Sequence, residues 1–262
     1  MKDSYQSVQM MWRTCLSVAF ILLTLSATAQ VGEHRSDFSL GVSGGYMLSN
    51  VGFQPNVPQG MQGGMIFGVT ARYVAEKYFK SVCAIVGEVN VAQMGWKEDI
   101  LTVTNEPVLK VVGSGTEPLA YTRKLTYVQI PVLARMGWGK ERKGFQGFIQ
   151  AGPQIGFLLS ESTDTNITED DVLVNERVST IVAQESMPVE KKFDYGVVLG
   201  AGVEFSHPKA GHFLFEARYY YGLGNIYGSS KRDYFSKSNN GNIVFKLTYL
   251  FDLHKTKNDK IK

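Results

Sequence analysis

The 262-residue chain has few cysteines, few histidines and no long apolar segment. Of its two cysteines, Cys15 falls in an N-terminal segment that resembles an export signal, so Cys83 is left without an intramolecular partner. The longest apolar run, residues 16–25, has about ten residues, roughly half of what a membrane-spanning helix needs. These shortages exclude a disulfide framework and a helical membrane protein.

The first 29 residues have the features of a cleaved secretory signal. Basic residues precede the apolar run, and Ala27-Thr28-Ala29 forms a small-x-small cleavage site, so we expect cleavage before Gln30. Removing this segment leaves a nearly balanced charge, which gives no reason to expect a nucleic-acid partner. The start residue stays open between Met1, Met10 and Met11.

What the chain has in quantity is glycine, aromatic residues and two-residue alternation. In residues 242–251, every second residue from Ile243 to Phe251 is large and apolar, which is typical of a strand with one apolar face. Seven further segments show the same period, each about as long as a strand that crosses a bilayer. The predicted strands are residues 38–48, 64–73, 83–92, 127–136, 145–157, 193–205, 213–221 and 242–251.

This pattern predicts an all-β fold: an eight-stranded antiparallel up-and-down transmembrane β-barrel of OmpA/OmpX-like size. The expected organisation is a signal peptide at 1–29, a short linker at 30–36, the barrel at 37–253 and a basic tail at 254–262. An exported barrel of this kind belongs in the bacterial outer membrane, with outer-membrane lipid around it.

The predicted connections alternate between short and long. The short ones are residues 74–81, 137–144 and 206–211, and the long ones are 50–63, 96–124, 160–192 and 222–241. In bacterial outer-membrane barrels, short turns face the periplasm and long loops face outward, so the first strand is expected to start in the periplasm.

Alternation alone does not say which face points inward, so a soluble eight-stranded barrel with an apolar ligand cavity is a competing interpretation. The unequal loops favour the membrane, as does the Gly- and Gln-rich character of the other face. Aromatic residues near both ends of the apolar faces would form two interfacial girdles. They are Phe38, Tyr73, Phe145, Phe205, Phe213 and Phe251 at one end, and Tyr46, Phe157, Phe193 and Tyr221 at the other.

Seven charged residues fall on the face that this arrangement places inside the barrel. An eight-stranded barrel is only wide enough for its own side chains, so we expect these groups to pair across a closed interior as a structural network. A proton or ion relay is the functional alternative. The seven are Glu88, Glu216, Arg218 and Lys246 near mid-barrel, and Arg72, Arg135 and Glu204 nearer the periplasmic end.

The sequence does not favour an enzyme. All four histidines fall at the predicted periplasmic end, which disfavours a Ser-His site at the outer leaflet. The third long loop is acidic but lacks the ligand spacing of a calcium site, so a solvated loop is expected, with no catalytic residue, metal or cofactor. Its acidic residues are Glu161, Asp164, Glu169, Asp170, Asp171, Glu176, Glu185 and Glu190.

The second and third long loops also contain apolar alternation, which predicts hairpins that extend above the membrane. Their exposed strand edges could bind a protein partner, so surface binding is the function that the residues support best. A part in a transport or secretion assembly is the alternative function, and a small lipid-modifying enzyme is less supported than either. Because a closed barrel has no free edge, we expect a monomer. The apolar loop residues are Ile100, Val103, Val108, Val111 and Val112, then Val172, Val174 and Val178.

The segment Leu125-Thr126-Tyr127-Val128-Gln129-Ile130-Pro131 resembles the Leu-x-Tyr-x-x-Ile-Pro strand of the PorT-like outer-membrane β-barrel proteins of Bacteroidetes. Residues 41–45, 193–204, 216–226 and 247–251 are also similar, in the same order. The resemblance implies an eight-stranded outer-membrane barrel, mostly without an assigned activity, and raises type IX protein secretion as a role; it transfers no functional residue.

Two features stand out against this resemblance. Pro131 lies inside a strand, where a bulge is expected to absorb the lost hydrogen bond. The chain also continues past the terminal aromatic Phe251, which predicts either a disordered extension or a contact with a periplasmic partner.

Overall fold

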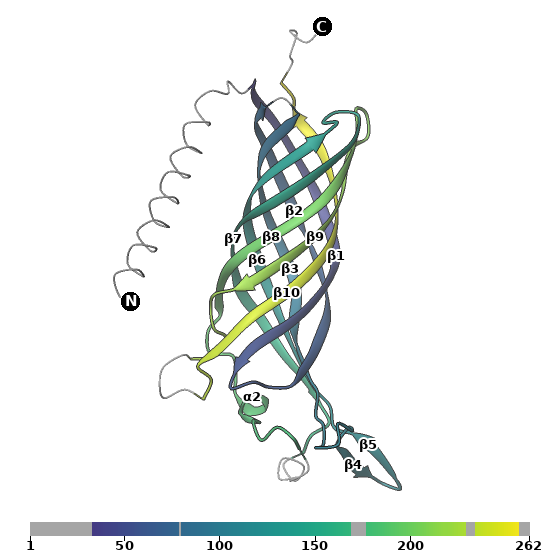
Figure 1. Ribbon diagram of the computed structural model, residues 1–262, viewed down its shortest axis with the longest axis vertical. Coiled ribbons are helices and arrows are strands. Elements are labelled where there is room, and N and C mark those ends of the chain that lie inside the picture. Colours follow the sequence, from purple (N-terminus) through teal and green to yellow (C-terminus); the bar gives the residue numbers. More distant parts are fainter. Residues whose placement is uncertain (1–32, 79, 169–176, 229–233, 257–262) are drawn as a thin grey trace, which may run out of the picture.

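The computed structural model describes residues 33–78, 80–168, 177–228 and 234–256. Eight long strands form one closed barrel in which every pair is antiparallel (Figure 1). Each strand pairs with its neighbour along the chain, and the first pairs with the last. They are β1 (Glu33–Gln54), β2 (Gln59–Tyr78), β3 (Ser81–Glu98), β6 (Tyr121–Gly139), β7 (Gly144–Thr165), β8 (Phe193–His207), β9 (Gly211–Gly222) and β10 (Lys237–His254).

The predicted eight-stranded up-and-down barrel is thereby confirmed. Between β3 and β6, β4 (Leu109–Val112) and β5 (Gly115–Pro118) form a separate two-stranded sheet, and a short helix, α2 (Ala183–Ser186), lies between β7 and β8. No helix in the described ranges is both long and apolar enough to span a membrane.

The outer surface of the barrel is apolar because burial follows the two-residue period of the strands. Along β8, for example, exposed and buried residues alternate, and the exposed ones from Phe193 to Phe205 are apolar. Leu199 and Leu247 are each 64% exposed at mid-strand. A continuous apolar belt around the outside of a barrel marks a surface that contacts lipid.

Aromatic side chains pack in pairs at both ends of this belt. On β7 and β8, Phe145 packs on Phe205 at a centroid distance of 5.0 Å at one end, and Phe157 packs on Phe193 at 5.2 Å at the other. All the residues predicted for the two girdles are exposed, except Phe38, which is only partly exposed.

The strands are longer than the segments predicted from alternation. β1 begins at Glu33, so residues 33–36 belong to the sheet and not to the linker expected there. At the other end the ladder continues above the apolar belt, where Gln59 still pairs with Glu98 and Tyr121 with Thr165. The loops predicted at 50–63, 96–124 and 160–192 are correspondingly shorter. The segment predicted to be a signal peptide and the end of the predicted tail, beyond Thr256, lie outside the described residues.

Pro131 lies in β6 without a bulge. β3 and β6 keep one register on both sides of it, and the register shift between β6 and β7 falls at Thr126/Tyr127 instead. The prediction of a bulge at Pro131 is therefore wrong.

Candidate functional site

The middle of the barrel is occupied by a charge network centred on Glu88. Its carboxylate accepts hydrogen bonds from Arg218 Nη1 at 2.8 Å and Nη2 at 2.6 Å, a bidentate arrangement. Lys246 Nζ donates to the same carboxylate at 2.6 Å. Glu88 and Lys246 are almost fully buried, with exposed fractions of 3% and 1%.

Glu216 joins the centre of this network to the next layer. Its Oε1 lies 2.7 Å from Arg218 Nη2 and 3.3 Å from Lys246 Nζ. Its Oε2 accepts a hydrogen bond of 2.7 Å from Gln150, and Gln150 in turn accepts two from Arg135, at 3.1 and 3.0 Å.

Nearer the short turns, a second group of ion pairs is centred on Glu204. Arg72 donates to Glu204 at 2.7 Å, and Arg135 Nη1 lies 3.5 Å from the same carboxylate. His212 lies between two carboxylates, with Nδ1 2.8 Å from Glu204 and Nε2 2.9 Å from Asp252.

The structure thus brings all seven charged residues expected in the lumen into one connected chain of ion pairs. It adds Asp252 and His212, which the sequence interpretation left out. Both share the inward parity of their strands, Asp252 with Lys246 on β10 and His212 with Glu216 on β9, so the same period could have identified them. Asp252 was missed because it follows the terminal aromatic residue.

The loop end of the barrel is filled differently, with apolar and aromatic side chains. Phe53 packs edge-on against Trp96 at 5.3 Å and against Phe235 at 4.9 Å. The cluster extends from inward-facing strand residues such as Met47 and Leu125 to the loops. Sequence alternation did not predict this cluster, because inward residues at this end are as apolar as outward ones.

The β4–β5 hairpin projects beyond the loop end of the barrel (Figure 1). Val111 is 78% exposed, and Val103, in the segment before β4, is 87% exposed. A hairpin predicted in the second loop is therefore present over residues 109–118. Ile100 and Val108 instead lie in the buried cluster, while Val172 and Val174 lie outside the described residues.

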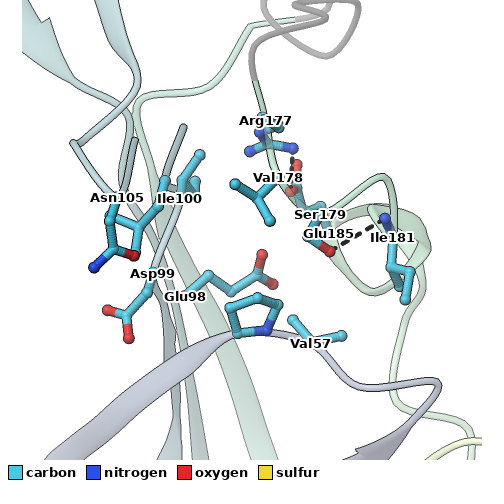
Figure 2. A pocket seen from close by; sticks show the side chains of 12 residues that line it. Val57, Glu98, Asp99, Ile100, Asn105, Arg177, Val178, Ser179, Ile181 and Glu185 are labelled. Carbon is cyan, nitrogen blue, oxygen red and sulfur yellow. Dashed lines mark hydrogen bonds and ion pairs between the residues drawn. The ribbon is translucent and has the colours of Figure 1, made fainter. Parts of the chain in front are cut away.

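Beside the hairpin, three loop segments enclose a small pocket (Figure 2). Glu98, the last residue of β3, is buried there and accepts hydrogen bonds from Trp96 Nε1 at 3.3 Å and Gln184 Nε2 at 3.1 Å. Burial, reinforced by the nearby Glu185 carboxylate, raises the pKa of Glu98 to about 7. Glu185 itself pairs with Arg177 at 2.8 Å.

The acidic third loop is therefore less solvated than expected. Glu185 contacts Arg177, and Glu161 accepts a hydrogen bond of 2.8 Å from Arg123. Among the described residues, no group of three potential ligands could hold a metal ion. All four histidines lie at the end with the short turns: His34 and His212 are the second residues of β1 and β9, and His207 and His254 are the last residues of β8 and β10. Of the acidic residues predicted in this loop, Glu169, Asp170, Asp171 and Glu176 lie outside the described residues.

Residues 28–228 match a family model described as the outer membrane protein beta-barrel domain. No curated protein sequence matches the chain.

Three solved structures are similar to this chain at low identity. The attachment invasion locus protein Ail of Yersinia pestis is 14% identical, with 81% of this chain and 98% of that chain covered and a TM-score of 0.33. Neisserial surface protein A is 12% identical, with coverages of 84% and 100% and a TM-score of 0.39. OprG of Pseudomonas aeruginosa is 11% identical, with coverages of 84% and 98% and a TM-score of 0.36.

Proposed function

Because the chain belongs to the outer membrane protein beta-barrel domain family, we propose that it is a non-enzymatic surface-interaction barrel whose extracellular loops bind a protein partner. The observation that carries the proposal is the exposed apolar β4–β5 hairpin at the end of a barrel whose interior is filled with side chains. Long loops of such barrels face outward, so the proposal has this hairpin outside the cell.

The lumen supports a scaffold role. The carboxylates of Glu88, Glu204 and Glu216 each lie against at least one cation. The buried Asp194 instead accepts hydrogen bonds from the neutral Tyr220 and Asn240. Removing one partner of a buried pair is costly, so such a network fixes the barrel in one arrangement. An ion relay would instead need a hydrated path through these contacts.

The hairpin supports the binding role. Within the described residues, β4 and β5 pair only with each other, so no further strand lies along either outer edge, although the Pro118 carbonyl on β5 accepts a hydrogen bond from Asn166. Such an edge offers a place for another strand to pair. Its exposed side chains, among them Leu109 and Val111, offer apolar contact area beside these edges. A partner that adds an extended segment to such an edge gains backbone hydrogen bonds as well as apolar burial.

The alternative, a part in a transport or PorT-like secretion assembly, requires contacts on the periplasmic side. The described residues on that side form short turns, such as the one between Gly139 and Gly144. The third candidate, a lipid-modifying enzyme, has no histidine near the outer end among the described residues.

Photo-crosslinking in intact cells separates these functions. A crosslinking amino acid at Val111, on the hairpin, is expected to capture a protein, whereas one at the exposed Lys143, in a periplasmic turn, captures none. The matched control is Leu199 on the lipid face, where only lipid adducts are expected. Protein adducts from Lys143 alone would reject surface binding in favour of a periplasmic assembly.

A further inference from the structure

The pocket at the loop end has the size of a small ligand. Its volume is about 150 Å³, and its walls come from the β1–β2 connection, the end of β3 and the segment that leads into α2. Most of the lining is apolar, contributed by Val57, Pro58, Ile100, Val178 and Ile181.

The polar groups of this pocket are mainly acidic. Glu98 is 7% exposed, and Figure 2 shows its carboxylate pointing into the space between Val57 and Val178. Its hydrogen-bond donors, Trp96 and Gln184, are both neutral, and it forms no ion pair with any described residue. Arg177 lowers the pKa of Glu98, but burial and Glu185 raise it more. A buried carboxylate whose direct partners are neutral is costly to ionise unless a cation reaches it.

Among the described residues that line the pocket, the one cation is already engaged. Arg177 forms its ion pair with Glu185 at 2.8 Å, and both side chains are mostly buried. Asp99 adds a third carboxyl group to the lining, which leaves the pocket with more acidic than basic groups. An anionic ligand would face Glu98 and Glu185, so the charge of the pocket selects for a cation.

We propose that this pocket binds an ammonium group carried on a short apolar chain, as in a primary alkylamine or a lysine side chain. The ammonium group forms an ion pair with Glu98, and the apolar chain contacts Val57, Ile100 and Val178. This inference goes beyond the proposed function and does not depend on the hairpin, because none of residues 109–118 lines the pocket.

Binding and ionisation are linked at this site. Because a cation favours the charged form of Glu98, whose pKa lies at about 7, binding releases a proton near neutral pH. The affinity for an alkylammonium ion therefore rises from pH 6 to pH 8, a range in which the amine itself stays charged.

Isothermal titration calorimetry of the full-length protein in detergent micelles tests the proposal with n-butylamine as the probe. Binding is expected at pH 8, weaker binding at pH 6, and no binding of the neutral n-butanol or the anionic butyrate. Glu98→Gln is expected to weaken binding by about tenfold or more. The control is Glu106→Gln, which removes an exposed carboxylate of the same loop outside the pocket and is expected to leave the affinity for n-butylamine unchanged.

A second titration separates the two sources of the ammonium group. Tighter binding of Nα-acetyl-lysine amide than of n-butylamine indicates a lysine of a protein partner, and the reverse order indicates a free amine. Equal binding to wild type and Glu98→Gln would overturn the proposal, as would preferred binding of butyrate. If the variant does not fold, the comparison of amine, alcohol and acid on the wild-type protein decides alone.

Discussion

At the scale of single residues, Glu88 contacts cations from two different strands, Arg218 on β9 and Lys246 on β10. We predict that Glu88→Gln lowers the free energy of unfolding by about 3 kcal/mol or more, because it leaves both cations with less countercharge inside the barrel. Urea-induced unfolding of the protein in lipid vesicles measures this change. The matched control is Glu106→Gln, an exposed loop carboxylate, which should shift stability by less than about 0.5 kcal/mol. Identical unfolding of the two variants would contradict the structural role of the network.

Glu98 gives a residue-scale prediction about pH. The pKa of Glu98 is raised from 4.5 to about 7 in the folded protein, because ionisation is costly there. The stability of this loop is therefore highest below pH 4.5, falls as the pH rises from 4.5 to about 7, and stays constant at higher pH. Trp96 donates a hydrogen bond to Glu98 and is buried, so its fluorescence should report the ionisation. In a Trp138→Phe background we expect a fluorescence transition near pH 7 that Glu98→Gln abolishes. The same transition in the Glu98→Gln protein would assign it to another group.

At the scale of strands, two glycines test which face points inward. A Cβ added at Gly45 of β1 would lie 2.2 Å from the carbonyl oxygen of Phe245, whereas one added at Gly87 of β3 meets nothing within 4 Å. Because valine favours strands, any loss of folding on substitution reports the steric conflict and not the backbone preference. We predict that Gly45→Val prevents or strongly reduces barrel formation and that Gly87→Val folds as wild type does. The readout is the heat-dependent shift in gel mobility; the opposite order would mean that the two faces are interchanged.

The strands were predictable from sequence wherever the two faces differ. On β8 and β9 the outward residues are apolar and the inward ones, apart from Val198, Leu214 and Tyr220, are charged, polar or glycine, so the period gives both the strand and its orientation. On the outer parts of β1, β2 and β3 the inward residues, such as Met47, Ile66 and Met94, are apolar too. The contrast between faces is lost there, and the length of these strands could not be read from it.

The contacts inside the lumen were only partly predictable. Parity on a strand says that Glu88 and Lys246 both point inward, but they are 158 positions apart, and their 2.6 Å contact depends on how the barrel closes. The Glu98 pocket was not predicted at all. It is formed by three loop segments whose mutual packing leaves no periodic signal in the sequence.

At the scale of the whole molecule, the barrel is closed by two different kinds of packing. Ion pairs fill the middle and the turn end, and an aromatic and aliphatic cluster fills the loop end. The first layer satisfies polar groups that would otherwise be buried without partners, and the second excludes water from the outer mouth. Together they leave the loop segments beyond the barrel as the surface on which the proposed binding would take place.

The central claim is that the interior of this outer-membrane barrel is a filled scaffold and not a pathway. Planar-bilayer recording of the purified protein tests it most directly, with a porin of known conductance in the same bilayer as the control. We predict that the protein inserts, as shown by heat-modifiable mobility after recovery, but gives no steady conductance. A steady, ion-selective conductance that changes in the Glu88→Gln protein would show that the charge network lines a pathway, and would contradict the account.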